Sequence, residues 1–195
     1  MAILCLPVLS AQASPTSDAL VIGIQSSKTT SLNPLFPVER DMLSIFDLMY
    51  DSLITIDDNY QPQAGLAESW TQTGNGRTWT FTLRQGVLFS DGEKCDAYAI
   101  KANFDAILEN KDRHTWLEMM NLLVGVSAPD ENTFVIEMSE PYYPMLTELG
   151  CIRPFAMISP NCMIDGSTMN GVNGYIGTGP YVLTDFVTDE YAVFE

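Results

Sequence analysis

Basic side chains are scarce in this sequence, and two of them have neighbours that suit the binding of an anion. The 195 residues carry nine Lys and Arg against 25 Asp and Glu. Arg153 stands in the apolar run 151–157, where a partly buried guanidinium needs an anionic partner. That partner is either a carboxylate of the chain itself or a ligand carboxylate held by two parallel hydrogen bonds. Arg113 precedes Trp116, whose indole could stack on a ligand or an arginine, or simply pack within a helix.

No group of residues forms a recognisable catalytic or metal site. His114 is the only histidine, so it can support neither a multi-histidine metal site nor a Ser/His/Asp arrangement that the sequence identifies. The Gly-Thr-Gly-Pro segment at 177–180 lacks the Gly-Lys-Ser/Thr ending of a phosphate loop, and we interpret it as a tight turn before a strand. We therefore expect a protein that is not an enzyme, with no catalytic residue and no cofactor.

The cysteine pattern leaves two alternatives open. If a leader containing Cys5 is removed, Cys95, Cys151 and Cys162 remain, an odd number without the spacing of a zinc site. Cys151 and Cys162 could form a disulfide in an oxidising compartment. The other alternative is that each cysteine is a small buried apolar residue.

Composition and charge exclude several classes of partner. The formal net charge is −16 and no basic cluster is present, which argues against nucleic acid and against an anionic membrane surface. No apolar run reaches the roughly 18 residues of a transmembrane helix. Residues 2–9 are apolar and precede Ala11-Gln-Ala13, which is typical of the second half of a secretory signal peptide. We predict that residues 1–17 are the remnant of a signal peptide and a disordered start.

The hydrophobic pattern predicts short hairpins mixed with helices, an α/β (mixed α+β) lobe. Helical periodicity occurs in 41–53, 97–108 and 141–149. Strands are predicted at 20–24, 79–83, 124–126, 134–138, 181–183 and 191–194, with turns at 75–76 and 129–132. The Gly- and Asn-rich stretch 166–179 is expected to be a surface loop.

Several short motifs follow one another from about residue 20 to the end of the chain. They are Ser-Leu-Asn-Pro at 31–34, Gly-Leu-Ala-Glu-Ser-Trp at 65–70, Val-Leu-Phe-Ser-Asp-Gly at 87–92, Ala-Tyr-Ala-Ile-Lys-Ala-Asn-Phe at 97–104 and Ile-Gly-Thr-Gly-Pro-Tyr at 176–181. In this order they resemble the extracytoplasmic solute-binding proteins of the peptide/nickel group of ABC importers, family 5. The stretches 103–110, 113–118, 142–144 and 153–155 are more similar to its nickel-binding members than to its peptide-binding ones.

The resemblance implies a receptor for nickel in complex with a small carboxylate-bearing chelator. Carried over by position, Arg113 and Arg153 would hold the chelator's carboxylates. Trp116 would form part of the pocket wall, and Met42 would lie near the metal complex. Pro37 departs from the pattern, since the nickel-binding members have a pocket aromatic there. The alternative is a dipeptide- or oligopeptide-binding receptor of the same group.

The resemblance also predicts the domain organisation and the partners. Residues 18–195 would be the first lobe of a two-lobed, periplasmic binding protein-like (class II) fold. Within that lobe, 18–45 and 176–195 would form the main sheet and 46–175 an inserted subdomain. The second lobe, with the histidine that ligates nickel directly, would be absent from this N-terminal fragment, so no metal ligand is predicted here. We expect a periplasmic monomer that works with an ABC permease in the inner membrane.

Overall fold

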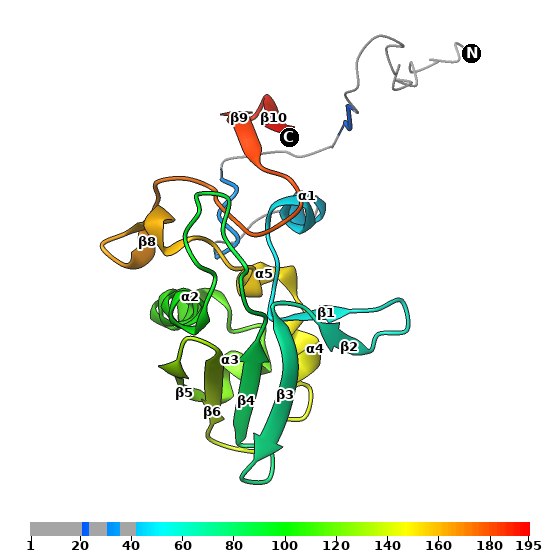
Figure 1. Cartoon of the computed structure of the whole chain (residues 1–195), viewed down its shortest axis with the longest axis vertical. Helices are drawn as coiled ribbons and strands as arrows, with labels where there is room; N and C mark the ends of the chain where they lie inside the picture. Colours follow the sequence, from blue (N-terminus) through cyan, green and yellow to red (C-terminus); the bar gives the residue numbers. More distant parts are fainter. Residues whose placement is uncertain (1–20, 24–30, 36–41) are drawn as a thin grey trace, which may run out of the picture.

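The computed structural model describes residues 21–23, 31–35 and 42–195 as a mixed helix and sheet fold, as predicted (Figure 1). Its helices are α1 (Leu43–Met49), α2 (Ala97–Glu109), α3 (Glu118–Leu122), α4 (Met145–Leu149) and α5 (Ile152–Phe155), with 3-10 turns η2 (Lys111–Arg113) and η3 (Pro160–Cys162). Its strands are β1 (Ile54–Ile56), β2 (Pro62–Ala64), β3 (Ala67–Thr73), β4 (Thr78–Leu83), β5 (Leu123–Asp130), β6 (Thr133–Met138), β7 (Met163–Ile164), β8 (Ser167–Val172), β9 (Leu183–Val187) and β10 (Tyr191–Phe194). No helix in these ranges is both long and apolar enough to cross a bilayer.

The largest sheet is antiparallel, with strand order β3-β4-β6-β5. Asn75 and Gly76, both at positive φ, form the turn between β3 and β4, which confirms the predicted hairpin. Alternate residues of β4 and β6 are buried, as expected for strands with one face on the core: Trp79, Phe81, Leu83, Phe134, Ile136 and Met138.

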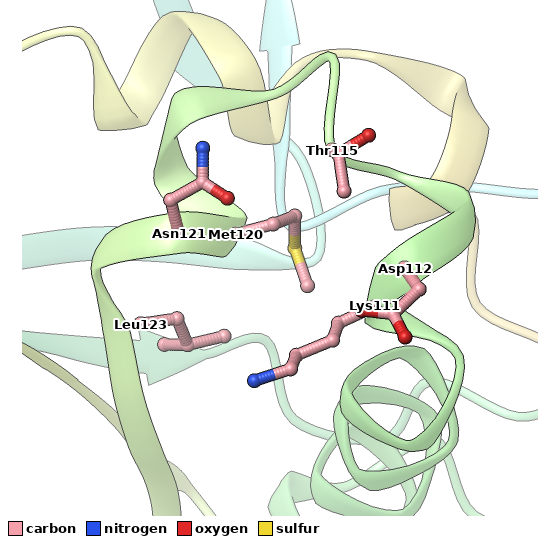
Figure 2. Close-up of a pocket in the computed structure, with 6 residues that line it drawn as sticks. All are labelled: Lys111, Asp112, Thr115, Met120, Asn121 and Leu123. Atoms are coloured by element: carbon pink, nitrogen blue, oxygen red, sulfur yellow. The ribbon is translucent and has the colours of Figure 1, made fainter.

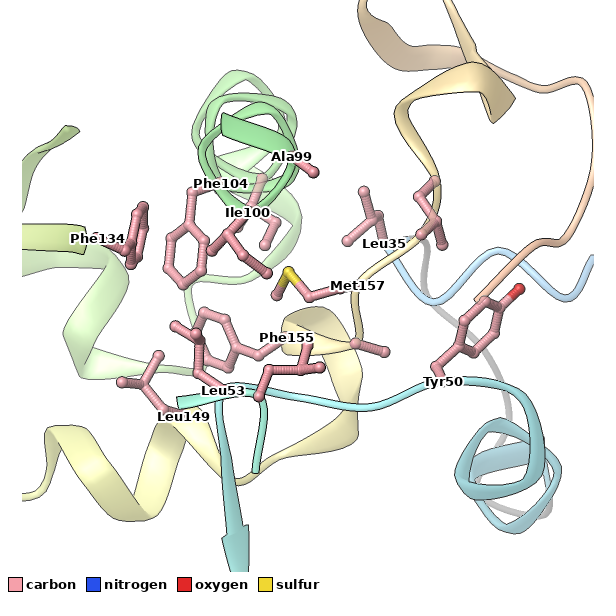
Figure 3. Packing of buried hydrophobic residues seen from close by; sticks show 14 of the residues in the cluster. Leu35, Tyr50, Leu53, Ala99, Ile100, Phe104, Phe134, Leu149, Phe155 and Met157 are labelled. Atoms are coloured by element: carbon pink, nitrogen blue, oxygen red, sulfur yellow. The ribbon is translucent and has the colours of Figure 1, made fainter. Parts of the chain in front are cut away.

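Helix α2 packs against β5 and β6 and connects the core of the sheet with α5. Its start is fixed by Asp96, whose carboxylate accepts hydrogen bonds from the amides of Tyr98 and Ala99 at 2.9 and 3.0 Å. The ring of Phe104 lies 4.9 Å from Phe134 of the sheet and 5.7 Å from Phe155 of α5, measured between centroids. Figure 3 shows these three rings in one cluster, so a single core joins the sheet, α2 and α5.

The segment 176–181 crosses closely over the end of α1. The amide of Gly179 donates to the carbonyl of Met49 at 2.9 Å, and the hydroxyl of Thr178 donates to Asp51 at 2.8 Å. A Cβ atom added at Gly177 would collide with the carbonyl oxygen of Met49. These glycines therefore serve close backbone packing before β9, in agreement with the turn predicted there.

Several sequence predictions need correction or lie outside the described residues. Residues 21–23 are exposed and form no strand, whereas 20, 24 and 1–17 lie outside the described part of the chain. Helix α1 is shorter than predicted because Tyr50 is extended (φ −128°, ψ 150°) and its hydroxyl donates to the carbonyl of Leu32 at 2.9 Å.

The predicted loop 166–179 was wrong over its first half. Asp165 and Gly166, both at positive φ, form a tight turn that pairs β7 with β8. The strand predicted at 181–183 begins at Leu183 and pairs with β10. Cys95, Cys151 and Cys162 are all free, with Cys95 and Cys162 buried, so the structure has no disulfide between Cys151 and Cys162.

We predict that Gly177→Ala lowers the free energy of unfolding by about 1–3 kcal/mol or more, because the new methyl group meets backbone that cannot move aside. Urea denaturation followed by circular dichroism measures this change. Gly125→Ala is the matched control, since nothing lies within 4 Å of a Cβ there and it should change stability by less than about 1 kcal/mol. Equal midpoints for the two variants would contradict the prediction.

Candidate functional site

The loop between α2 and α3 carries two of the predicted site residues. Its first turn is fixed by Asn110, whose side-chain amide donates to the carbonyl of Ala106 at 2.9 Å at the end of α2. The amide of Arg113 then donates to the carbonyl of Asn110, and the amide of Leu117 to the carbonyl of His114. These turns leave Arg113 and Trp116 at the surface, and Trp116 is 52% exposed.

Arg153 comes from a separate segment, 152–158, that is held on α2 by a buried amide. Asn103, with no exposed surface, donates to the carbonyl of Ile158 at 2.9 Å and accepts from the amide of Ile158 at 3.0 Å. The amide of Met157 also donates to the carbonyl of Asp51 at 2.9 Å. Arg153 itself has extended backbone angles (φ −118°, ψ 123°) and is partly buried.

The two segments meet where the guanidinium of Arg153 lies over the indole of Trp116. The Cζ atom of Arg153 is 5.2 Å from the ring centroid, within the range of a cation–π contact. Burial lowers the pKa of His114, and the positive charges of Arg153 and Arg113 lower it further. The structure thus brings Arg153 into contact with Trp116, 37 positions earlier in the sequence, and Arg113 lies three residues before Trp116 in the same loop.

Met42 and His114 both lie in the interior. Met42 is 1% exposed at the start of α1, so it is a core residue of this lobe. Helix α1 packs against α5, the helix that contains Arg153. His114 was not predicted as a site residue, because one histidine in a polar stretch gives no periodic signal. It is fully buried and follows Arg113 directly in the sequence.

Glu148 of α4 holds the far end of the same loop. Its carboxylate accepts the amide of Met119, in the first turn of α3, at 3.0 Å and the hydroxyl of Tyr142 at 2.6 Å. Burial raises the pKa of Tyr142, and the hydrogen bond to Glu148 raises it further, so the phenol stays a donor. The loop is therefore anchored at Asn110 and at Met119, on either side of Trp116.

A shallow hollow lies beside the loop (Figure 2). It is lined by Lys111, Asp112, Thr115, Met120, Asn121 and Leu123. None of Arg113, Trp116 and Arg153 belongs to this lining, so the hollow is distinct from the arginine–tryptophan contact.

The chemistry of the contact is that of an anion-binding face. Two guanidinium groups offer planar pairs of donors that match carboxylates, and the indole offers a flat stacking surface. Within residues 21–23, 31–35 and 42–195, no three His, Cys, Asp or Glu side chains are grouped so that they could hold a metal ion.

Comparison with known proteins places the chain in a family. The model of the bacterial extracellular solute-binding proteins, family 5 (middle), matches residues 61–195. The chain belongs to this family. The resemblance inferred from the motifs is therefore confirmed.

This family 5 protein is similar to two curated relatives and one solved structure that show its relationships within the family. It is 40% identical over 163 residues to the nickel-binding periplasmic protein of Escherichia coli K12, covering 84% of this chain and 31% of that one. It is 34% identical over 176 residues to the glutathione-binding protein GsiB of Salmonella paratyphi A, covering 86% and 33%. NikA from Brucella suis, solved in complex with Fe(III)-EDTA, matches with a TM-score of 0.80 and 38% identity over 85% of this chain and 33% of that one. The chain thus spans about a third of the length of these relatives.

We predict that Asn103→Leu destabilises the fold by about 2–5 kcal/mol, because both backbone groups of Ile158 lose a buried partner. Thermal and urea denaturation measure the loss. Asn121→Leu replaces an exposed asparagine on α3 and should stay within about 0.5 kcal/mol of wild type. A variant at Asn103 as stable as the one at Asn121 would show that the amide bridge does not hold the Arg153 segment.

Proposed function

We propose that the protein is the substrate-binding component of an ABC importer that captures nickel as a complex with a small carboxylate-bearing chelator and delivers it to a membrane permease. The observation that carries the proposal is the contact of Arg153 with Trp116, with Arg113 three residues earlier in the loop of Trp116. This face suits the chelator and not a bare cation, because two guanidinium groups repel a positive ion. The identity of 40% to a nickel-binding protein supports nickel as the metal.

The proposed roles follow from the chemistry of each side chain. Arg113 and Arg153 bind the carboxylates of the chelator, and Trp116 stacks on its plane and fixes the orientation of Arg153. Met42, which is buried in this lobe, is proposed to lie near the metal complex. The direct metal ligand comes from a second lobe, and closure of the two lobes traps the ligand.

We also infer how the lobe is divided. Residues 18–45 and 176–195 belong to its main sheet, and 46–175 form an inserted subdomain. The pairings support this division, because β9 and β10 pair with each other while the four-stranded sheet comes entirely from residues 67–138. The protein acts as a periplasmic monomer and docks on the permease of the inner membrane.

A receptor for peptides is the second candidate, favoured by the 34% identity to a glutathione-binding protein. Glutathione also carries carboxylates, so the same arginines could hold it. The two functions differ in whether metal is needed for binding.

Calorimetric titration of the full-length protein distinguishes them. We expect Ni²⁺ with citrate or with L-histidine to bind far more tightly than Ni²⁺ alone, glutathione or a dipeptide. Arg153→Ala should weaken chelate binding by about 30-fold or more, because a charged hydrogen-bonding partner of the ligand is lost.

Arg77→Ala is the matched control, since this exposed arginine lies on the β3–β4 hairpin away from the loop. It should bind like wild type. Equal affinities for bare Ni²⁺ and for the chelates would contradict the proposal, and tight binding of glutathione without metal would favour the second candidate.

A further inference from the structure

Helix α3, which follows the loop of Trp116, begins without a cap from its own sequence. Its N-cap residue is Leu117, whose side chain accepts no hydrogen bond from the first amides of the helix. The carboxylate of Glu148 on α4 takes this role, because its Oε2 accepts the amide of Met119 at 3.0 Å. Trp116 therefore lies three residues before an amide that is held by another helix.

A tyrosine in turn fixes the carboxylate of Glu148. The hydroxyl of Tyr142 donates to Oε1 at 2.6 Å, so each carboxylate oxygen has a partner of its own. Hydrogen bonds to an ionised acceptor are short and strong, and two of them on different oxygens restrict the orientation of the side chain. Through Glu148, Tyr142 also acts on the position of the loop.

The backbone of Glu148 connects to the second segment of the arginine–tryptophan contact. Its carbonyl accepts the amide of Cys151 at 2.9 Å, two residues before Arg153. The next residue, Leu149, has no exposed surface and packs this end of α4 in the core. Glu148 thus contacts both of the chain segments that meet where Arg153 lies over the ring of Trp116.

We propose that Glu148 is a positioning residue for the arginine–tryptophan face. Its carboxylate sets the position of Trp116 against the guanidinium of Arg153, and Tyr142 fixes that carboxylate. This inference rests on the proposed function, in which the face binds the chelator. Its effect on binding has the opposite sign to that of charge. Removing a negative charge from this part of the lobe would by charge alone strengthen the binding of an anion, whereas losing the positioning contact weakens it.

Calorimetric titration of the full-length protein with Fe(III)-EDTA, an anionic metal chelate, measures this effect. Glu148→Ala should weaken binding by about 5- to 20-fold, because a charge-assisted hydrogen bond that holds the loop of Trp116 is lost. Glu148→Gln keeps an oxygen for the amide of Met119 and should restore the affinity close to that of wild type. Glu118→Ala is the matched control, since it removes an exposed carboxylate of α3, and it should not weaken binding.

A pair of neighbouring tyrosines tests the second contact. Tyr142→Phe removes the hydroxyl that fixes Glu148 and should weaken binding by about 2- to 10-fold. Tyr143→Phe is its matched control, since Tyr143 is 67% exposed, and it should bind as wild type does. In the Glu148→Ala background Tyr142→Phe should cause no further loss, because the tyrosine acts through the carboxylate. If Glu148→Ala does not fold, the two single tyrosine variants decide the question.

Fluorine NMR separates positioning from stability. In protein labelled with fluorotryptophan, Trp116→Phe identifies the resonance of Trp116, and Arg153→Ala shows where this resonance lies without the cation. Glu148→Ala should move the resonance toward that position, whereas Glu118→Ala should leave it in place. A residue that only stabilised the fold would change the population of unfolded protein and not the resonance of the folded state.

Failure of the inference and failure of the proposed function give different results. If Glu148→Ala binds as tightly as Glu118→Ala, or if the resonance of Trp116 stays in place, the positioning role is wrong although the face still binds a chelate. If wild type binds neither Fe(III)-EDTA nor Ni²⁺ with L-histidine, the proposed function is wrong. The resonance of Trp116 alone then decides whether Glu148 positions the loop.

Discussion

The buried amide of Asn103 is the interaction on which the rest of the lobe depends. It pairs with both backbone groups of Ile158 and also donates to Ala99 within its own helix. The same segment also forms an antiparallel bridge between Ala156 and Ser52, and the amide of Met157 donates to the carbonyl of Asp51. Asn103 adds the link to α2, so the segment that carries Arg153 is held on the helix as well as on the chain after α1.

The candidate site is assembled from two segments that the core brings together. Different kinds of contact hold each segment in place. The Arg153 segment is fixed by buried hydrogen bonds and by the stacking of Phe155 on Phe104. The loop of Arg113 and Trp116 is anchored near its ends by Asn110 and by the carboxylate of Glu148, and between these anchors Trp116 contacts Arg153. Its buried side chains are His114 and Leu117, which hold the loop on the core.

Much of the fold could be predicted from local patterns, and the site only in part. Three features could be predicted directly because they depend only on neighbours in the sequence. They are the alternation of buried and less buried residues in β4 and β6, the Asn75-Gly76 turn and the helical period of α2. The β7–β8 hairpin was missed because glycine and asparagine hide a strand signal. The nearness of Arg153 and Trp116 could be expected only through the family resemblance, since a contact between distant segments leaves no periodic trace. His114 was missed because burial of a single polar residue is decided by the segments that cover it.

The crossing of 176–181 over α1 also has a consequence for how the chain is organised. Hydrogen bonds from Gly179 to Met49 and from Thr178 to Asp51 bring the two ends of the intervening segment side by side. A segment whose ends meet can be inserted into a host chain without pulling the host apart, because its entry and exit points nearly coincide. The nearness of these two ends agrees with the proposal that 46–175 form an inserted subdomain, and at this crossing Gly177 leaves no room for a side chain.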